Sequence, residues 1–317
     1  MTKSEILFYY ESRQNPNGDP DSENQPRLMH DETIMVTDVR IKRTMRDFAK
    51  EKYGYTLFVD NSKDGSFVTA DTRAKDIAKE CNDESGDYVK ILLENTFDVP
   101  LFGGLVTIRK PKEGEKGESG SQKITGPLQF GIGRSVNRVN LIQPTITSRF
   151  VGAVKDELKA QHGTIGKFYA VEYALIKIHG ALNPVNLGKY LVEDYPKIKE
   201  NFTKYCEQLP EILYDGTTQL VTRSKYPQRS ILYLQVDYKD VLYNDLPSIV
   251  SESSNLRSKD TTPTELGESP FDFTKLVKTL NERKDKIEKI RIKYADDIKS
   301  DVSEMLSQLD DIKVDNL

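Results

Sequence analysis

The stretch from Ile6 to Phe48 constrains this chain most, because it joins three segments of very different chemistry. The apolar run Ile6–Tyr10 is typical of a β-strand buried on both faces. It leads into a polar loop, ESRQNPNGDPDSENQPR (residues 11–27), which is too rich in Asn, Gly, Asp and Pro to lie in a core. A basic segment, VTDVRIKRTMRDF (residues 36–48), follows. This order predicts a strand, an exposed loop and a helix that together can bind an anionic chain.

The helix predicted from about Val36 has two unlike sides, and Thr37 or Asp38 can cap its start. One side is apolar at helical spacing and comprises Ile41, Met45, Phe48 and Ala49. The opposite arc is basic and comprises Lys42, Arg43, Arg46 and Lys50. Basic residues three or four apart rise from one surface, where they contact phosphates and supply sequence-independent affinity. An ordinary solvated helix face is the alternative.

Composition sets limits on the class of protein. The chain has 317 residues, 37% hydrophobic and 30% charged, which suits one large domain or two. No apolar run approaches a membrane span and the N-terminus does not resemble a signal peptide. Cys81 and Cys206 are far apart, which favours reduced thiols in a cytoplasmic protein. With only three His residues, the sequence argues against a His-rich metal site, and we expect no cofactor.

The net charge of −4 argues against nucleic-acid binding, but the charge is unevenly distributed. No acidic residue occurs from Ser119 to Lys155, a window that contains Lys123, Arg134, Arg138, Arg149 and Lys155. Local fields rather than the total charge decide where a polyanion binds.

Periodicity predicts an α+β fold. We expect strands at Leu128–Gly133, Thr145–Val154, Phe168–Asn183 and Arg229–Asp240, and a helix from about Asn186 to Leu209 with a possible kink at Pro196. Residues 55–70 suggest a hairpin, and residues 71–81 and 87–95 short helices. The order of strand, helix, insertion, two strands, helix and strand is that of a ferredoxin-like or RNA-recognition-type sheet with large insertions.

Three further segments carry candidate contacts. The turn formers from Asn15 to Pro20 can aim backbone N–H groups at a phosphate or sugar edge, and their place before the basic helix favours that role over a plain surface loop. In GPLQFGIGRSVNRV (residues 126–139), glycines allow close backbone approach beside Arg134, Ser135 and Asn137. In TRSKYPQRS (residues 222–230), a surface loop and an RNA contact by Arg223 and Lys225 are equally supported.

Catalysis has weaker support. The carboxylates Asp19, Asp21, Glu23, Asp31 and Asp38 cluster in sequence, and two of them can in principle hold Mg²⁺. Asp19 and Asp21 lie where turns favour Asp, however, and Asp38 suits a helix cap. No Ser-His-Asp, Cys-His or P-loop pattern is present. We therefore expect a protein that is not an enzyme.

A set of motifs occurs in order along the chain. The motifs are NPNGDPDSENQPR with VTDVRIKRTMRDF, then DVPLFGG, GPLQFGIGRSVN, FYAVEYALIKIHGALNP and TRSKYPQRSILYLQVDYK. This ordered set resembles the Cas-seven family. These are backbone subunits of type I CRISPR Cascade complexes in the RAMP superfamily, and the likeness is greatest to subtype I-B. It covers about residues 4–240. DVPLFGG has Pro100 where the family often has a basic residue, which puts an RNA contact there in doubt.

The resemblance implies an RNA-recognition-type palm (residues 1–54 and 126–244), a finger insertion (55–125) and a thumb β-hairpin (about 149–168). A linker or surface loop (245–270) and a helical C-terminal segment (271–317) complete the expected organisation. Several copies would stack along one guide RNA (crRNA) and leave its bases free to pair with target DNA in antiviral defence. The implied partners are the guide, the target DNA, neighbouring copies and other Cascade subunits (Cas-five, large and small subunits), with no membrane.

The residues expected at the RNA are Asn15, Asn17, Gly18, Arg27, Thr37, Lys42, Arg43, Arg46, Arg134, Ser135, Asn137, Arg149, Arg223 and Lys225. The thumb wedge is expected to comprise Phe150, Val151, His162 and Phe168. One alternative is a metal-dependent endoribonuclease that uses Asp19, as in related type III subunits; Mg²⁺-dependent cleavage of complementary RNA that is lost in Asp19→Ala would favour it. Another is a subunit that binds only protein, through the apolar residues that recur at helical spacing between Phe273 and Leu309. Such a subunit would purify without RNA.

Overall fold

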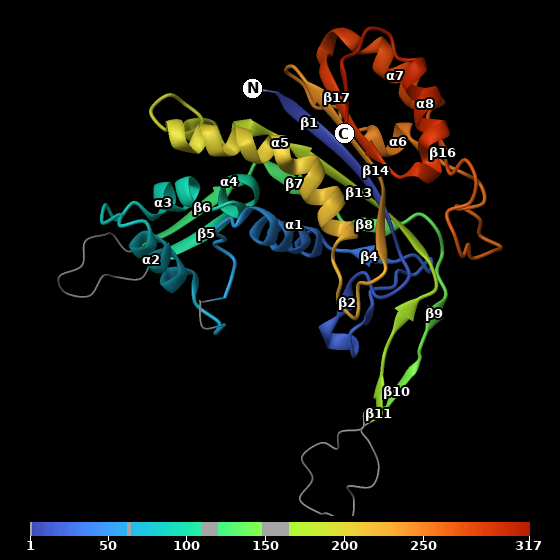
Figure 1. The fold of residues 1–317 in the computed structure, drawn as a ribbon, viewed down its shortest axis with the longest axis horizontal. Coiled ribbons are helices and arrows are strands. Elements are labelled where there is room, and N and C mark those ends of the chain that lie inside the picture. Colours follow the sequence, from blue (N-terminus) through green and yellow to red (C-terminus); the bar gives the residue numbers. More distant parts are fainter. Residues whose placement is uncertain (1, 62–64, 109–119, 148–164) are drawn as a thin grey trace, which may run out of the picture.

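The computed structural model describes residues 2–61, 65–108, 120–147 and 165–317, and a single large sheet organises it (Figure 1). Strand β1 (Lys3–Ser12) lies inside this sheet, antiparallel to β13 (Ala174–Leu182) on one side and β14 (Gln228–Tyr238) on the other. Residues 4–10 are all buried, although successive side chains of a strand point to opposite faces. The predicted strand buried on both faces is therefore confirmed.

The remaining strands extend the sheet at both edges. Beyond β13 lie β7 (Leu128–Phe130), β8 (Gly133–Ser135) and β4 (Met35–Val36), all antiparallel to their neighbours. Beyond β14 lie the antiparallel β17 (Ile287–Tyr294) and the parallel β18 (Val314–Asn316). The resulting order is β18-β17-β14-β1-β13-β8-β4.

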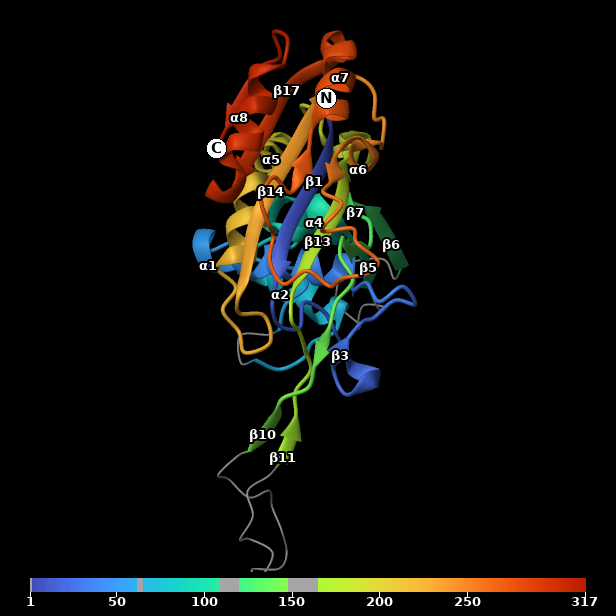
Figure 2. The ribbon, with the colours of Figure 1, turned by 90° about the vertical axis from the view of Figure 1, so that its right-hand side faces the viewer.

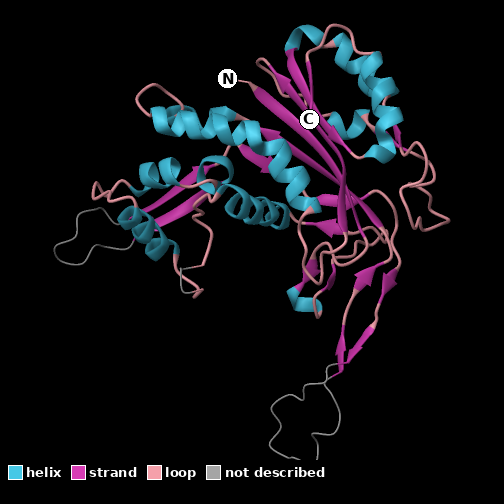
Figure 3. Cartoon of the chain, in the orientation of Figure 1, coloured by secondary structure: helices cyan, strands magenta, loops and turns pink. Residues whose placement is uncertain are grey.

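Two long helices cover one face of the sheet (Figures 1 and 3). In the order of the chain, helix α1 (Asp38–Tyr53) follows β1, and α5 (Pro196–Thr218) connects β13 to β14. They bury Phe8 and Tyr10 of β1 in a shared core. Where the helices meet, a Cβ on Gly216 would lie 2.9 Å from the Cβ of Phe48, so only glycine permits this approach.

The helix expected from Asn186 instead begins at Pro196. A 3₁₀ segment, η3 (Pro184–Tyr190), precedes it. Proline lacks an N–H and has a helical φ, so it suits the first turn of a helix, where that N–H has no partner. Pro196 therefore starts α5 and does not kink it.

The opposite face of the sheet is covered by the C-terminal part of the chain (Figure 2). Leu7 and Tyr9 of β1 pack there in a second core. The covering elements are α6 (Leu246–Ile249), β15 (Ser251–Glu252), β16 (Phe271–Asp272), α7 (Thr274–Glu282), η4 (Lys284–Lys286), η5 (Asp296–Ile298) and α8 (Lys299–Ser307). The buried Glu5 carboxylate accepts the backbone N–H groups of Tyr243 at 2.7 Å and Asp245 at 3.1 Å, which fixes the chain where it enters this region.

The structure departs from two expectations for this region. Residues 245–270 were expected to be a linker or surface loop; residues 253–270 do contain no helix or strand and are mostly exposed, but Leu246, Ile249, Val250 and Leu256 are buried in the second core. Residues 271–317 are not wholly helical either, since residues 287–294 form the strand β17. The register of β17 against β14 shifts between Asp237 and Tyr238. This bulge lets Ile287 and Ile290 both be buried, and their spacing of three imitates a helical period.

A separate lobe lies to one side of α1 (Figure 1) and comprises most of the expected finger insertion. It contains α2 (Ala70–Glu80), α3 (Tyr88–Asn95), α4 (Asp98–Phe102) and the antiparallel pair β5 (Gly103–Ile108) and β6 (Gly120–Thr125). The two short helices predicted here are confirmed. The hairpin predicted over residues 55–70 is wrong, because residues 55–61 and 65–69 contain no strand.

A narrow arm extends from the other end of the sheet (Figures 1 and 2). Two antiparallel pairs build it: β9 (Leu141–Ile142) with β12 (Ala170–Val171), and β10 (Thr145–Thr147) with β11 (Ile165–Lys167). Beside its root, the loop after β1 forms β2 (Gly18–Asp19), η1 (Pro20–Ser22) and β3 (Gln25–Pro26). The expected thumb lies largely outside the described residues, which include only its base.

The place of β17 in the sheet can be tested by replacing Ile290, which is fully buried. We expect Ile290→Ala to lower the free energy of unfolding by about 2–5 kcal/mol, because it leaves a cavity between the sheet and the C-terminal helices. Glu288→Ala, at an exposed position of the same strand, should change it by less than about 1 kcal/mol. Urea titration of both variants measures the difference, and equal effects would contradict the strand assignment.

Candidate nucleic-acid interface

The loop after β1 is held by its own hydrogen bonds. The buried Asn15 donates from Nδ2 to the Asn24 carbonyl at 2.5 Å. A Cβ on Gly18 would lie 2.0 Å from Asn24 Oδ1, so the loop closes only around glycine. Asn17 Nδ2 donates to Thr37 Oγ1 at 3.5 Å, which links the loop to the residue before α1. Thr37 occupies the N-cap position without a side-chain cap bond.

The same loop is joined to residues 222–227, far along the chain. The Asn15 N–H donates to the Ser224 carbonyl at 3.0 Å, and Lys225 Nζ donates to the Asn15 carbonyl. Within the described chain, the buried Asn15 Oδ1 has no hydrogen-bond partner. Two segments that were predicted separately as RNA contacts therefore form one surface.

A pair of neighbouring cations lies at this junction. Burial lowers the pKa of Lys225 to about 8, and the positive charge of Arg40 acts in the same direction. Burial also lowers the pKa of Arg40, on the first turn of α1. Among the described residues, neither side chain forms an ion pair with a carboxylate. Two neighbouring cations that repel each other form a site suited to an anion, because a bound anion relieves the repulsion.

The sequence pointed to Lys225 but missed Arg40. The basic row was counted from Lys42, whereas Arg40 lies three residues before Arg43 and so belongs to the same helical row. Extending that row toward the loop would have included it.

The basic arc of α1 is largely neutralised by carboxylates of the chain itself. Lys42 Nζ donates to Asp38 Oδ2 at 3.0 Å, and also to Gln129 Oε1 at 3.2 Å. Arg43 pairs with Asp47 at 2.8 Å, and half of its side chain is exposed. A surface pair such as that of Arg43 is weak, so Arg43 remains available to a phosphate. The Lys42 side chain is only 12% exposed.

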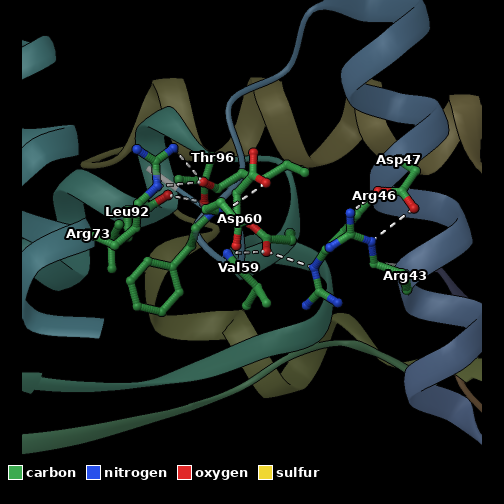
Figure 4. Close-up of polar contacts among 12 residues, drawn as sticks. Arg43, Arg46, Asp47, Val59, Asp60, Arg73, Leu92 and Thr96 are labelled. Atoms are coloured by element: carbon green, nitrogen blue, oxygen red, sulfur yellow. Dashed lines mark hydrogen bonds and ion pairs between the residues drawn. The ribbon is translucent and has the colours of Figure 1, made fainter. Parts of the chain in front are cut away.

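Arg46 departs most from expectation, because it is buried (Figure 4). Its Nε donates to Asp98 Oδ2 at 2.8 Å, and Asp98 also accepts the N–H groups of Phe58 at 2.8 Å and Val59 at 3.0 Å. Figure 4 shows Arg46 directed toward the chain near Val59, while Arg43 pairs with Asp47. The finger lobe covers this part of the arc, so Arg46 joins α1 to that lobe and does not present a phosphate contact.

The segment after β8 also contains residues that serve the interior. Ser135 Oγ accepts the Ile34 N–H at 2.8 Å and donates to the Asn137 carbonyl. Asn137 is fully buried, donates to the Tyr173 carbonyl at 3.1 Å and accepts the Leu175 N–H at 2.9 Å. The expectation that these two side chains line the RNA is therefore wrong: Ser135 joins β8 to the segment before β4, and Asn137 joins the chain after β8 to β13. Arg134 is half exposed and pairs with Asp31 at 2.6 Å.

The other predicted residues lie near the junction or outside the described chain. Arg27 pairs with Asp19 at 3.4 Å, and Asp19 also accepts the Asp21 N–H. Arg223 is exposed and stacks over the Phe168 ring, 5.6 Å from its centroid. Positions outside the described residues are Arg149, Phe150, Val151 and His162.

Neither a metal site nor a membrane-spanning helix is found among the described residues. No group of three or more His, Cys, Asp or Glu side chains is placed there to hold a metal ion. No helix in that part of the chain combines the length and apolar character needed to cross a membrane.

The profile of the family "CRISPR-associated protein Cas7" matches residues 2–274. The chain belongs to the Cas7 family. The family predicted from the ordered motifs is thus confirmed, over a longer stretch than those motifs covered. A search of the curated proteins finds no match.

One solved structure with a TM-score above 0.5 shows the same fold at low sequence identity. A chain of a "CRISPR RNA-guided surveillance complex" is 11% identical, with a TM-score of 0.53 over 99% of this Cas7 protein and 94% of that chain. A pre-nicking form of such a complex gives 14% identity and a TM-score of 0.47, over 93% and 92%. A type III-B Cmr-beta complex bound to cognate target RNA gives 10% and 0.37, over 72% and 59%.

The buried pair predicts a large difference between two arginines of α1. Arg46→Ala should lower the free energy of unfolding by about 3–5 kcal/mol, because it leaves the Asp98 carboxylate buried without its cation. Arg43→Ala removes an exposed pair and should cost less than about 1 kcal/mol. Denaturant titration measures both values, and a similar small cost for Arg46→Ala would show that the pair does not join α1 to the lobe.

Proposed function

We propose that this Cas7 protein is the guide-RNA-binding backbone subunit of a type I CRISPR surveillance complex. It assembles as several copies along the guide and leaves the guide's bases free to pair with target DNA. Membership of the Cas7 family supports this role. The observation that carries it at the level of residues is the junction of Asn15, Arg40 and Lys225, which offers a phosphate two cations that have no carboxylate partner in the described chain.

The sheet supports the proposed division into palm, fingers and thumb. The strands β14, β1, β13 and β8 lie side by side and antiparallel, with α1 and α5 as the crossovers, which is the arrangement of an RNA-recognition-type fold. We assign residues 1–54 and 126–244 to the palm and residues 55–125 to the fingers. The thumb is the arm whose described base is β9–β12 and β10–β11.

The proposed course of the guide follows the cations that remain available. Lys225, within residues 222–227, lies beside Arg40 and the loop after β1, and Arg223 stacks on Phe168 at the root of the arm. Arg43 continues the row along α1. Phosphate contacts of this type hold the backbone without reading sequence, so sequence recognition passes to base pairing.

We propose that the subunit is not an enzyme. Asp19, the candidate for metal-dependent RNA cleavage, pairs with Arg27 and accepts the Asp21 N–H. Such contacts are typical of an aspartate in a turn. We also place the protein in the cytoplasm, in keeping with its two free thiols, Cys81 and Cys206. Its further partners would be copies of itself and the other subunits of the complex.

Purification together with the other subunits tests the proposed guide site. Arg40→Ala combined with Lys225→Ala should reduce the RNA that co-purifies at least tenfold, since two phosphate contacts are lost. Folding should change little, because the relief of repulsion between the two cations offsets the loss of the Lys225 hydrogen bond to the Asn15 carbonyl. Lys278→Ala, at an exposed position on α7, is the matched control. Absorbance ratios and sequencing of the bound RNA give the result, and wild-type RNA content in the double variant would refute the site.

The lowered pKa of Lys225 predicts that RNA binding depends on pH. Lys225 is charged below about pH 8 and neutral above it, so affinity for RNA should fall as the pH rises from 7 to 9. A bound phosphate favours the charged form, which moves the midpoint upward. Lys225→Arg keeps its charge throughout and should show a flat profile. Fluorescence anisotropy with labelled guide RNA measures both curves, and parallel curves would contradict the assignment.

A further inference from the structure

The sheet has a second surface of interest, on the face opposite α1. Lys177 of β13 pairs in register with Tyr9 of β1 and with Arg134 of β8. Residues directly opposite in neighbouring strands share a face, so Lys177 and Arg134 lie on the side of Tyr9 and the second core. Arg40 influences Tyr10, whose side chain belongs to the first core. The two surfaces are therefore separated by the sheet.

The C-terminal cover stops short on this face. Lys177 Nζ donates to the Pro247 carbonyl at 2.6 Å and to Glu252 at 2.7 Å, so the cover reaches β13. Beyond β13, Ile132 is 62% exposed and about half of the Arg134 side chain is exposed. A strip of sheet along β8 is thus left open.

A groove of about 320 Å³ follows this strip, and a second groove of about 500 Å³ adjoins it. Val136 and Arg257 line both grooves, so the two grooves are neighbours, and we call them together the path. On one side the path is lined by β8, β13 and residues 30–33, and on the other by residues 247–259 of the C-terminal cover.

The path has more cations than carboxylates among its lining residues. The cations are Arg134, Arg138, Lys177, Arg257 and Lys259, and the carboxylates are Asp31, Glu32 and Glu252. Each carboxylate already pairs with one arginine or lysine. The exposed Arg257 stands between the two grooves, and its guanidinium has no ion pair or hydrogen bond to any described residue. An anion can bind Arg257 without displacing a carboxylate. The exposed ion pairs beside it, Arg134 with Asp31 and Arg138 with Glu32, are weak enough that their arginines can also contact an anion.

We propose that this path binds the phosphodiester backbone of a single-stranded nucleic acid other than the guide. The proposal rests on the proposed function, because pairing of the guide with one strand of target DNA releases the other strand next to the complex. That strand is an extended polyanion with unpaired bases. The path supplies cations for its phosphates, and the exposed Ile132 supplies an apolar surface for a base.

The test uses the guide-loaded complex and a fluorescein-labelled single-stranded DNA that is not complementary to the guide. Arg257→Glu should weaken its binding about tenfold and reduce the dependence of log affinity on log salt by about one. Lys278→Glu makes the same charge change at an exposed position of α7 and should leave both quantities unchanged. Anisotropy titrations between about 50 and 200 mM salt cover the informative range.

The outcomes separate this proposal from the function on which it rests. Wild-type complex that purifies without guide RNA would refute the proposed function. Equal DNA affinity in the two variants would refute the second path while the guide site stands. Loss of guide RNA from Arg257→Glu would show that the path belongs to the guide itself. Loss of a protein subunit with unchanged DNA binding would show that a protein occupies the path, and either result would overturn the inference.

Discussion

Burial of β1 on both faces is the constraint on which the rest of the structure depends. Its alternate side chains enter two cores, with Phe8 and Tyr10 under α1 and α5, and Leu7 and Tyr9 under the C-terminal elements. One strand therefore fixes the helices on one side relative to the cover on the other. Because β1 is held so firmly, its exit loop and the start of α1 have a defined position against residues 222–227.

Internal ion pairing decides which basic residues can serve a polyanion. The chain has 46 Lys and Arg residues and 50 Asp and Glu residues, so carboxylates are available to most positive charges. On α1, Lys42 and Arg43 pair within the helix, and Arg46 pairs across to Asp98. Arg40 and Lys225 have no such partner among the described residues. An acidic protein can thus bind RNA at the few places where its cations are left unpaired.

Sequence patterns predicted the elements whose burial follows a simple period. The continuous apolar run of β1, the two short finger helices and the Cas7 family itself were all predicted correctly. β17 was not, because a bulge opposite Asp237 and Tyr238 gives Ile287 and Ile290 a helical spacing within a strand. Ser135 and Asn137 were taken for surface polar residues, since nothing in a sequence shows that a polar side chain serves a neighbouring strand.

By itself, the sequence determined the family, the chain order of the main strands and long helices as far as residue 240, and the two segments that meet at the candidate RNA site. Tertiary structure alone decided which side chains in those segments are free to act. Arg46 and Asp98 are 52 positions apart, and Lys225 and Asn15 are 210 apart. Helical spacing describes only neighbours within a few turns, whereas burial and ion pairing depend on whatever the fold brings alongside. For that reason Arg46 became a structural residue, and Arg40 became the cation beside Lys225.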